Sequence, residues 1–201
     1  MKLYESYMKK PAIFLFPYVR RFIIFFALMG GMLILAAKGL HYLNRVDNAS
    51  QEGVKVLWRA PMMDGSGHMQ PAPFAAYRGR ILVVNFWASW CPPCVEELPA
   101  LAVLSQKFSG KNITFAGIAI DSVENVTHFL KARKNSMTYP GYIAGADGTT
   151  LAFALGNRQG GVPFTVVIDA TGTVRFQMLG RVDIAALRDC LNRLTVSSAQ
   201  P

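Results

Sequence analysis

The chain has 201 residues, of which 52% are hydrophobic and 16% are charged, and this composition is apolar for a soluble protein. Its net charge is +9, but residues 1–45 hold seven Lys/Arg against one acid, a net of +6, and the remaining 156 residues hold fourteen against eleven, a net of +3. The later part of the chain has one small basic cluster, at Lys131, Arg133 and Lys134, so we expect no nucleic-acid partner. The length leaves room for one ordinary domain and an appendage.

The N-terminal part of the chain contains an apolar segment. Residues 22–37 carry no charge, and extension to residue 43 adds only Lys38 and His41 as interruptions. A helix over 22–43 is roughly 33 Å long, enough to cross a bilayer. The basic residues precede it, so the positive-inside rule predicts a basic cytoplasmic tail over 1–21 and an outer location for everything after residue 43. We expect a retained transmembrane anchor over 22–43.

Two alternatives to a retained anchor remain open. A cleaved signal peptide fits a short apolar region after a basic stretch, but no clear small-residue cleavage site follows residues 34–37 (ILAA). A buried core helix is disfavoured because the segment is apolar all round. After the anchor, residues 44–57 are mostly polar and show no clear period, which predicts a linker.

The elements expected after the linker alternate between strands and helices. Residues 81–87 (ILVVNFW) and 113–120 (ITFAGIAI) are near-continuous β-branched and aromatic runs, typical of strands buried on both faces. A helix over 92–108 separates them, and its Pro92-Pro93 start suits a first helical turn. Strands separated by a helix imply parallel pairing.

The last third of the chain completes an α/β fold. Asp121-Ser122 is expected to cap a helix, and a loop with a short helix follows. Residues 165–169 and 173–178 predict a hairpin around the turn at 170–172. Asp183 is expected to cap the final helix. We therefore predict a mixed sheet flanked by helices in a domain over 58–197, followed by a disordered tail at 198–201.

Cys91 and Cys94 are separated by two residues at the junction between a predicted strand and a predicted helix. This spacing lets the two sulfurs meet in a disulfide, and the helix N-terminus offers N–H groups and positive potential to a thiolate at Cys91. The pKa of Cys91 is therefore expected below the value of about 8.5 of a free cysteine, which makes Cys91 the attacking thiol. Cys94, one turn into the helix, would close the disulfide and release the partner.

Other uses of a cysteine pair fit this sequence less well. Half a zinc site needs a second ligand pair, whereas the three histidines are scattered and Cys190 is the only other cysteine. Covalent haem attachment needs a histidine after the second cysteine, where Val95 stands. An inert structural disulfide remains open. Cys190 lies on the apolar face of the last predicted helix, where we expect a buried, inert thiol.

Residues 85–94 (NFWASWCPPC), followed by Glu97-Leu98-Pro99, closely resemble the TlpA/ResA-like family of membrane-anchored, thioredoxin-fold disulfide reductases. Residues 161–165 (GVPFT) are similar to the cis-proline loop of that family. The resemblance covers residues 58–197. It implies a thioredoxin-like mixed sheet and no cofactor other than a redox-active disulfide.

The resemblance also assigns roles to individual residues. It implies that Cys91 attacks, that Cys94 resolves, and that Pro163 follows a cis peptide bond, with the Val162 backbone beside the sulfurs to pair with a substrate strand. An ordinary trans proline is the alternative at Pro163. The residues expected to contact a substrate surround the cysteines or belong to the proline loop: Trp90, Pro92, Pro93, Val162 and Pro163.

Glu97 is a third candidate catalytic residue. Thioredoxins proper have an acid six residues before the first cysteine, where this chain has Asn85. On a helix, Glu97 falls on the same face as the apolar stripe, whereas Glu96 falls away from it and into water. A carboxyl group among leucines costs free energy unless it is paired or useful, and the family pattern also has an acid at this position. A glutamate that reaches the surface is the alternative.

The resemblance implies a reductase of envelope protein disulfides, of the cytochrome c or copper-site maturation type. Its substrates would be protein thiols and disulfides, its electron donor a membrane thiol carrier, and its site periplasmic, at the bacterial cytoplasmic membrane. A Cu(I) chaperone using the same two cysteines is the alternative. No Met-rich or His-rich tract supports it within the domain, although Met62, Met63, His68 and Met69 form a loose cluster. A structural tether would require unreactive cysteines.

Overall fold

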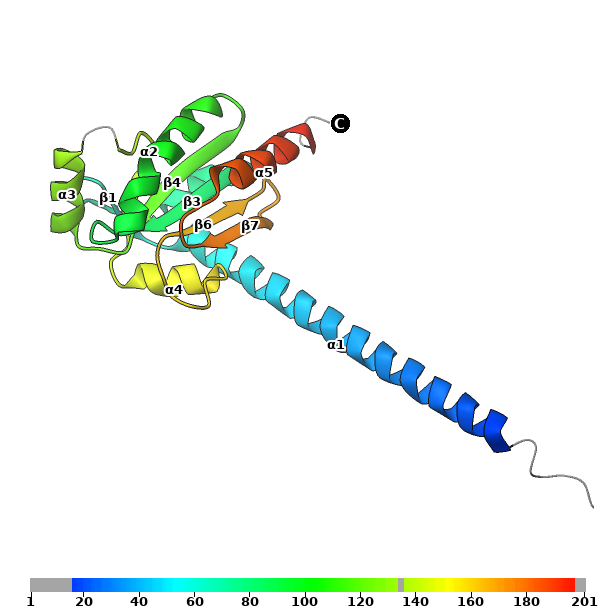
Figure 1. Ribbon diagram of the computed structural model, residues 1–201. Coiled ribbons are helices and arrows are strands. Elements are labelled where there is room, and N and C mark those ends of the chain that lie inside the picture. Colours follow the sequence, from blue (N-terminus) through cyan, green and yellow to red (C-terminus); the bar gives the residue numbers. More distant parts are fainter. Residues whose placement is uncertain (1–15, 134–135, 198–201) are drawn as a thin grey trace, which may run out of the picture. The chain divides into compact units, whose positions relative to one another are not determined.

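The computed structural model describes residues 16–133 and 136–197 (Figure 1); the side chains of residues 16–20, 22, 23, 27 and 37–49 are outside this description. The chain divides into two compact units, Met1–Arg45 and Val46–Pro201. The predicted tail at 198–201 and residues 1–15 of the predicted cytoplasmic tail lie outside the described residues.

The first helix, α1, runs from Phe16 to Arg59 and contains the predicted anchor. Within it, the described large apolar side chains from Ile24 to Leu35 are exposed, at 43–75%. Among the residues that the structure describes, no helix combines the length and the apolarity that a membrane crossing requires.

The structure differs from the predicted linker at 44–57, because this segment belongs to α1. Leu57 and Trp58 follow Val54 by three and four residues, so all three lie on one face of the helix. They are buried in the core of the second unit. Residues 44–53 of the same segment are mostly polar, so its overall composition does not reveal this short apolar stripe. The second unit accordingly starts at Val46 rather than at the predicted residue 58.

The second unit contains one seven-stranded mixed sheet in the order β2-β1-β5-β4-β3-β6-β7. Its elements are β1 (Met62–Asp64), β2 (Met69–Gln70), the 3-10 helix η1 (Pro73–Tyr77), β3 (Ile81–Trp87), α2 (Pro92–Lys107), β4 (Ile113–Ala119), α3 (Val123–Ala132), β5 (Gly141–Ile143), α4 (Asp147–Ala154), β6 (Phe164–Ile168), β7 (Val174–Leu179) and α5 (Ile184–Ser197). The long predicted elements are confirmed within one or two residues. The strands β1, β2 and β5 were not predicted, because two or three residues are too short to show a period.

The central strand β3 separates two apolar layers. Its residues Val83 and Trp87 face a core shared with α2, α3 and α5, whereas Leu82 and Phe86 face a core shared with α4 and the last turns of α1. Figure 1 shows α2 and α5 over one face of the sheet and α4 on the other. A strand buried on both faces reads as a continuous apolar run, which is why β3 was predictable.

The strand pairing brings two distant loops together. β3 pairs with β4 in parallel and with β6 in antiparallel orientation, and Phe86 near the end of β3 lies opposite Phe164 at the start of β6. The residues that follow β3 therefore lie beside the residues that precede β6. These are the two segments that carry the cysteine pair and the predicted proline loop.

Candidate active site

Cys91 and Cys94 form a disulfide, with the two Cα atoms 5.3 Å apart. Cys91 is the N-cap residue of α2, and the N–H of Cys94 donates to its Sγ over 3.3 Å. Pro92 and Pro93 fill the first turn, where proline's missing N–H leaves no hydrogen bond broken. The sulfur of Cys91 thus sits where the helix N-terminus favours negative charge.

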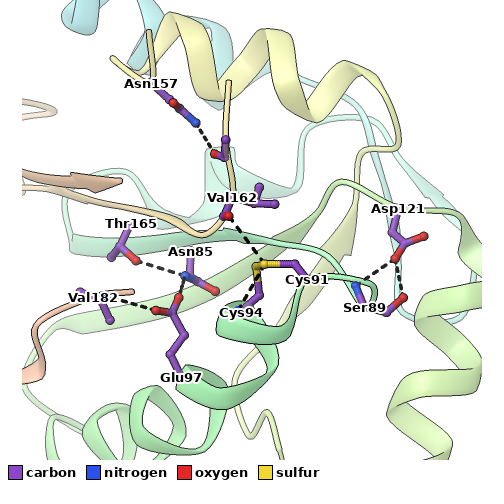
Figure 2. Close-up of a disulfide and its surroundings, with 11 residues drawn as sticks. Asn85, Ser89, Cys91, Cys94, Glu97, Asp121, Asn157, Val162, Thr165 and Val182 are labelled. Atoms are coloured by element: carbon purple, nitrogen blue, oxygen red, sulfur yellow. Dashed lines mark hydrogen bonds between the residues drawn. A yellow bond between two sulfur atoms is a disulfide. The ribbon is translucent and has the colours of Figure 1, made fainter. Parts of the chain in front are cut away.

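The second loop of the site meets the disulfide at Val162. The Val162–Pro163 peptide bond is cis, as the resemblance implied. The Val162 carbonyl oxygen lies 3.6 Å from Sγ of Cys91, a contact without a hydrogen bond in the disulfide form because the sulfur carries no proton (Figure 2). This contact helps explain why Cys91 is only 4% exposed, whereas the sequence predicted an exposed helix start.

Asn157 holds the cis-proline loop in place. Its Nδ2 donates to the Gly161 carbonyl oxygen over 2.7 Å (Figure 2). Its Oδ1 accepts from the Gly160 N–H over 3.0 Å. Asn157 is buried, so these bonds are shielded from water. Sequence reasoning missed this residue, because a single asparagine in a polar loop carries no spacing or period that marks it.

Glu97 is buried behind the disulfide, at 3% exposure. Its Oε1 accepts from Asn85 Nδ2 over 2.7 Å, and its Oε2 accepts from the Val182 N–H over 2.8 Å (Figure 2). Burial raises the pKa of Glu97, and the bonds from Val182 and Asn85 only partly offset this effect. Glu96 is exposed and forms an ion pair with Arg181. The predicted burial of Glu97 and exposure of Glu96 are both confirmed.

Trp90 is the exposed apolar side chain next to the nucleophile candidate, with 63% of its surface accessible. Pro92 is exposed and Pro93 is half-buried. The structure therefore brings the predicted contact residues Trp90, Pro92, Pro93, Val162 and Pro163 around one disulfide. Their contact with a substrate stays a prediction.

The methionines and His68 near β1 do not converge. Met62 is buried in the core beside α4, whereas Met63 packs against the core on the α2 side, because successive strand residues point to opposite faces. The side chains of His68 and Met69 are largely exposed. Among the described residues, no group of three or more His, Cys, Asp or Glu side chains is placed to hold a metal ion.

A mixed sheet with a disulfide at a helix N-terminus, next to a cis-proline loop, defines the thioredoxin-fold class of proteins. The sequence matches the AhpC/TSA family over residues 59–177, which is more than half of the chain. The chain belongs to this family. The relatives described next confirm the resemblance to TlpA/ResA-like proteins that the motifs indicated.

Two curated relatives carry redox names. The chain is 29% identical over 100 residues to the thiol-disulfide oxidoreductase ResA of Geobacillus thermodenitrificans, covering 49% of this chain and 54% of that protein. It is 33% identical over 112 residues to the thiol:disulfide interchange protein DsbE of Vibrio cholerae, covering 53% of this chain and 54% of that protein. The chain thus spans about half the length of each of these relatives.

The fold is also similar to solved structures. A thiol:disulfide interchange protein of the thioredoxin family from Chlorobium tepidum matches with a TM-score of 0.53 and 28% identity, over 68% of this chain and 95% of that chain. A DsbF homologue from Corynebacterium diphtheriae matches with a TM-score of 0.56 and 25% identity, over 67% and 83% of the two chains.

Proposed function

We propose that the protein is a thiol–disulfide oxidoreductase that acts on other proteins through Cys91 and Cys94. The observation that carries the proposal is the position of the Cys91 sulfur, which lies at the N-terminus of α2 and beside the Val162 carbonyl. The helix end stabilises a thiolate there, and the proline loop offers its backbone to a substrate strand. The redox names of the relatives support the same chemistry.

In the reducing direction, the Cys91 thiolate attacks one sulfur of a substrate disulfide. A mixed disulfide forms between Cys91 and the substrate, and the other substrate sulfur leaves as a thiolate, which takes up a proton. The Cys94 thiolate then attacks the Cys91 sulfur, so the Cys91–Cys94 disulfide forms and the second substrate sulfur leaves. The substrate gains two electrons, which the protein must recover from a thiol donor.

The direction and the partners of this exchange come from the family resemblance. We infer a reductase of envelope protein disulfides, of the cytochrome c or copper-site maturation type, that receives electrons from a membrane thiol carrier. Such a donor is needed because the compartment outside the cytoplasmic membrane keeps thiols oxidised.

We also infer that α1 anchors the protein in the cytoplasmic membrane, with the site on the outer side. The exposed apolar side chains between Ile24 and Leu35 support an apolar surrounding for this part of the helix. The Lys/Arg excess before residue 22 supports a cytoplasmic N-terminus. A phosphatase fused after Pro201 should then be active in cells, and the opposite result would place the domain inside.

The reduction potential of the Cys91–Cys94 pair tests the proposed function. We expect the oxidised full chain, equilibrated with a dithiothreitol or glutathione series, to titrate at or below about −250 mV, and an oxidant would titrate near about −120 mV. Cys190→Ser is the matched control and should leave the potential unchanged. A pair that neither equilibrates with the series nor reduces a model protein disulfide would be structural, and the proposal would be wrong.

A further inference from the structure

A side chain from a neighbouring loop holds the turn that presents Trp90 and Cys91. Asp121 follows β4, and its Oδ2 accepts hydrogen bonds from the Ser89 N–H over 2.9 Å and from Ser89 Oγ over 2.6 Å (Figure 2). Ser89 lies inside a tight turn that the Cys91 N–H closes by donating to the Ala88 carbonyl oxygen over 3.3 Å. The carboxylate therefore binds this turn just before Trp90.

The turn follows the last backbone hydrogen bonds between β3 and β4. The register of β3 and β4 ends at Trp87 opposite Ala119, and one further bond joins the Ile120 N–H to the Trp87 carbonyl. At Ser89, the backbone N–H donates to the Asp121 carboxylate instead of to a backbone carbonyl of β4. Both hydrogen bonds that tie Ser89 to the end of β4 thus go to one side chain, that of Asp121.

The other oxygen of the carboxylate fixes Asp121 itself. Oδ1 accepts from the Ser122 N–H over 2.8 Å and from Asn125 Nδ2 over 2.9 Å, at the start of α3. Asp121 is 8% exposed. Burial by itself raises the pKa of Asp121, but the bonds from Ser89, Asn125 and Ser122 together hold it below its ordinary value, so the group accepts as a carboxylate.

We propose that Asp121 is a positioning residue for disulfide exchange: by binding Ser89, it fixes the turn so that Cys91 caps α2 and Trp90 stands exposed beside it. The proposal rests on the proposed function of Cys91. The N–H of Cys94, 3.3 Å from the Cys91 sulfur, stabilises a thiolate only while Cys91 stays at the helix end. A turn free to move weakens this contact and misplaces the attacking sulfur.

The sign of the effect separates position from charge. A negative charge near Cys91 opposes a second one, so removal of the Asp121 charge, if charge were all that mattered, would lower the Cys91 pKa. Loss of the hydrogen bonds between Asp121 and Ser89 raises the Cys91 pKa, because the Cys91 thiolate then loses its stabilisation by the N-terminus of α2. Ser89→Ala isolates the second effect, since it removes one of the two bonds and leaves the charge in place.

Asp169 offers a matched control. It is also 8% exposed, and its carboxylate likewise accepts four hydrogen bonds, from the Thr171 N–H and Oγ1, the Thr173 N–H and Arg175 Nε. It lies in the turn between β6 and β7, outside the cysteine and proline loops. Asp121→Ala and Asp169→Ala therefore each remove four part-buried hydrogen bonds, from different places, and the Asp169 set includes the ion pair with Arg175.

The experiment measures Cys91 alkylation against pH in the reduced full chain with Cys190→Ser, together with the thermal midpoint. We expect both aspartate variants to lose stability, but only Asp121→Ala to raise the Cys91 pKa and to slow exchange with a model protein disulfide by about tenfold or more at neutral pH. Ser89→Ala should change both in the same direction by less, and it decides the question if Asp121→Ala does not fold.

Equal Cys91 reactivity in Asp121→Ala and Asp169→Ala, or a lowered Cys91 pKa in Asp121→Ala, would overturn the positioning role. Failure of the unaltered chain to exchange with any protein disulfide would instead count against the proposed function. In that case the alkylation series still decides whether Asp121 places the sulfur.

Discussion

Asn85 donates a hydrogen bond to Glu97 over 2.7 Å, so a residue of the central strand and one from the start of α2 hold each other behind the disulfide. The same Asn85 amide nitrogen also donates to Thr165 Oγ1 over 3.1 Å, on the neighbouring strand. Thioredoxins proper have an acid at the strand position. Here the acid comes from the helix, and the strand supplies the donor that binds it.

Replacement of Glu97 by glutamine should lower the apparent pKa of the thiols by about one unit. An ionised Glu97 opposes a second negative charge on the sulfurs, and the carboxyl and thiols therefore titrate as a coupled set. Thiolate absorbance against pH in the reduced protein measures the effect. Glu96→Gln is the control, because Glu96 is exposed and paired with Arg181, and its curve should match the unaltered protein. A Glu97→Gln curve that overlays it too would remove Glu97 from the redox chemistry.

Stability should fall as pH rises through the titration of Glu97. Burial raises the folded-state pKa of Glu97 above its ordinary value of 4.5, so in that interval the folded state keeps a proton that the unfolded chain has released. The contribution of protonated Glu97 to the free energy of unfolding is therefore fully present below pH 4.5 and is lost as the pH rises through the raised pKa. Urea midpoints of the oxidised protein from pH 4 to 8 measure it. The stability of Glu97→Gln relative to the unaltered chain should rise over this range, and parallel curves would contradict the prediction.

The three cysteines should differ in reactivity once the disulfide is reduced. Cys91 caps α2 and should alkylate fastest below about pH 8, whereas Cys94 is fully buried. Cys190 is as buried as Cys91, but it lies within α5 rather than at a helix N-terminus, and burial raises its pKa, so it should react slowly. Mass spectrometry after a short iodoacetamide pulse gives the order. Cys94→Ser should accumulate mixed disulfides with partners and Cys91→Ser should not; equal labelling of all three would refute these roles.

Asn157→Ala should weaken substrate binding more than it affects the thiols. The substitution removes the two side-chain bonds that hold Gly160 and Gly161, and this should lower the free energy of unfolding by about 1–3 kcal/mol. A looser proline loop should raise KM for a protein disulfide, while the Cys91 pKa, measured by alkylation against pH, stays near that of the unaltered chain because the N-terminus of α2 is unchanged. Asn192→Ala, on the exposed face of α5, is the control. An unchanged KM in a destabilised Asn157→Ala would mean that the asparagine serves the fold only.

Much of this architecture was predictable because its signals are local. The strands β3 and β4 are long apolar runs, α2 opens with two prolines, and Asp183 caps α5 with its Oδ1 accepting from the Ala185 and Ala186 N–H groups. The spacing of Cys91 and Cys94 at a strand-to-helix junction indicated the disulfide in the same way. Each of these features depends on neighbours within a few residues along the chain.

The remaining features depend on contacts between residues far apart in the sequence. Sequence periodicity placed Glu97 on a buried face, but its donors Asn85 and Val182 come from other elements. Asp121 acts through two hydrogen bonds to Ser89, 32 residues earlier, which form only when β4 lies beside β3. The bonds of Asn157 to Gly160 and Gly161 are local, but the loop that they hold reaches the disulfide only because β6 pairs with β3. The last turns of α1 belong to the domain because Val54, Leu57 and Trp58 pack in the same buried cluster as apolar residues of α4. Three apolar residues are too few to predict such a contact from the sequence, because the contact depends on where α4 lies in the fold.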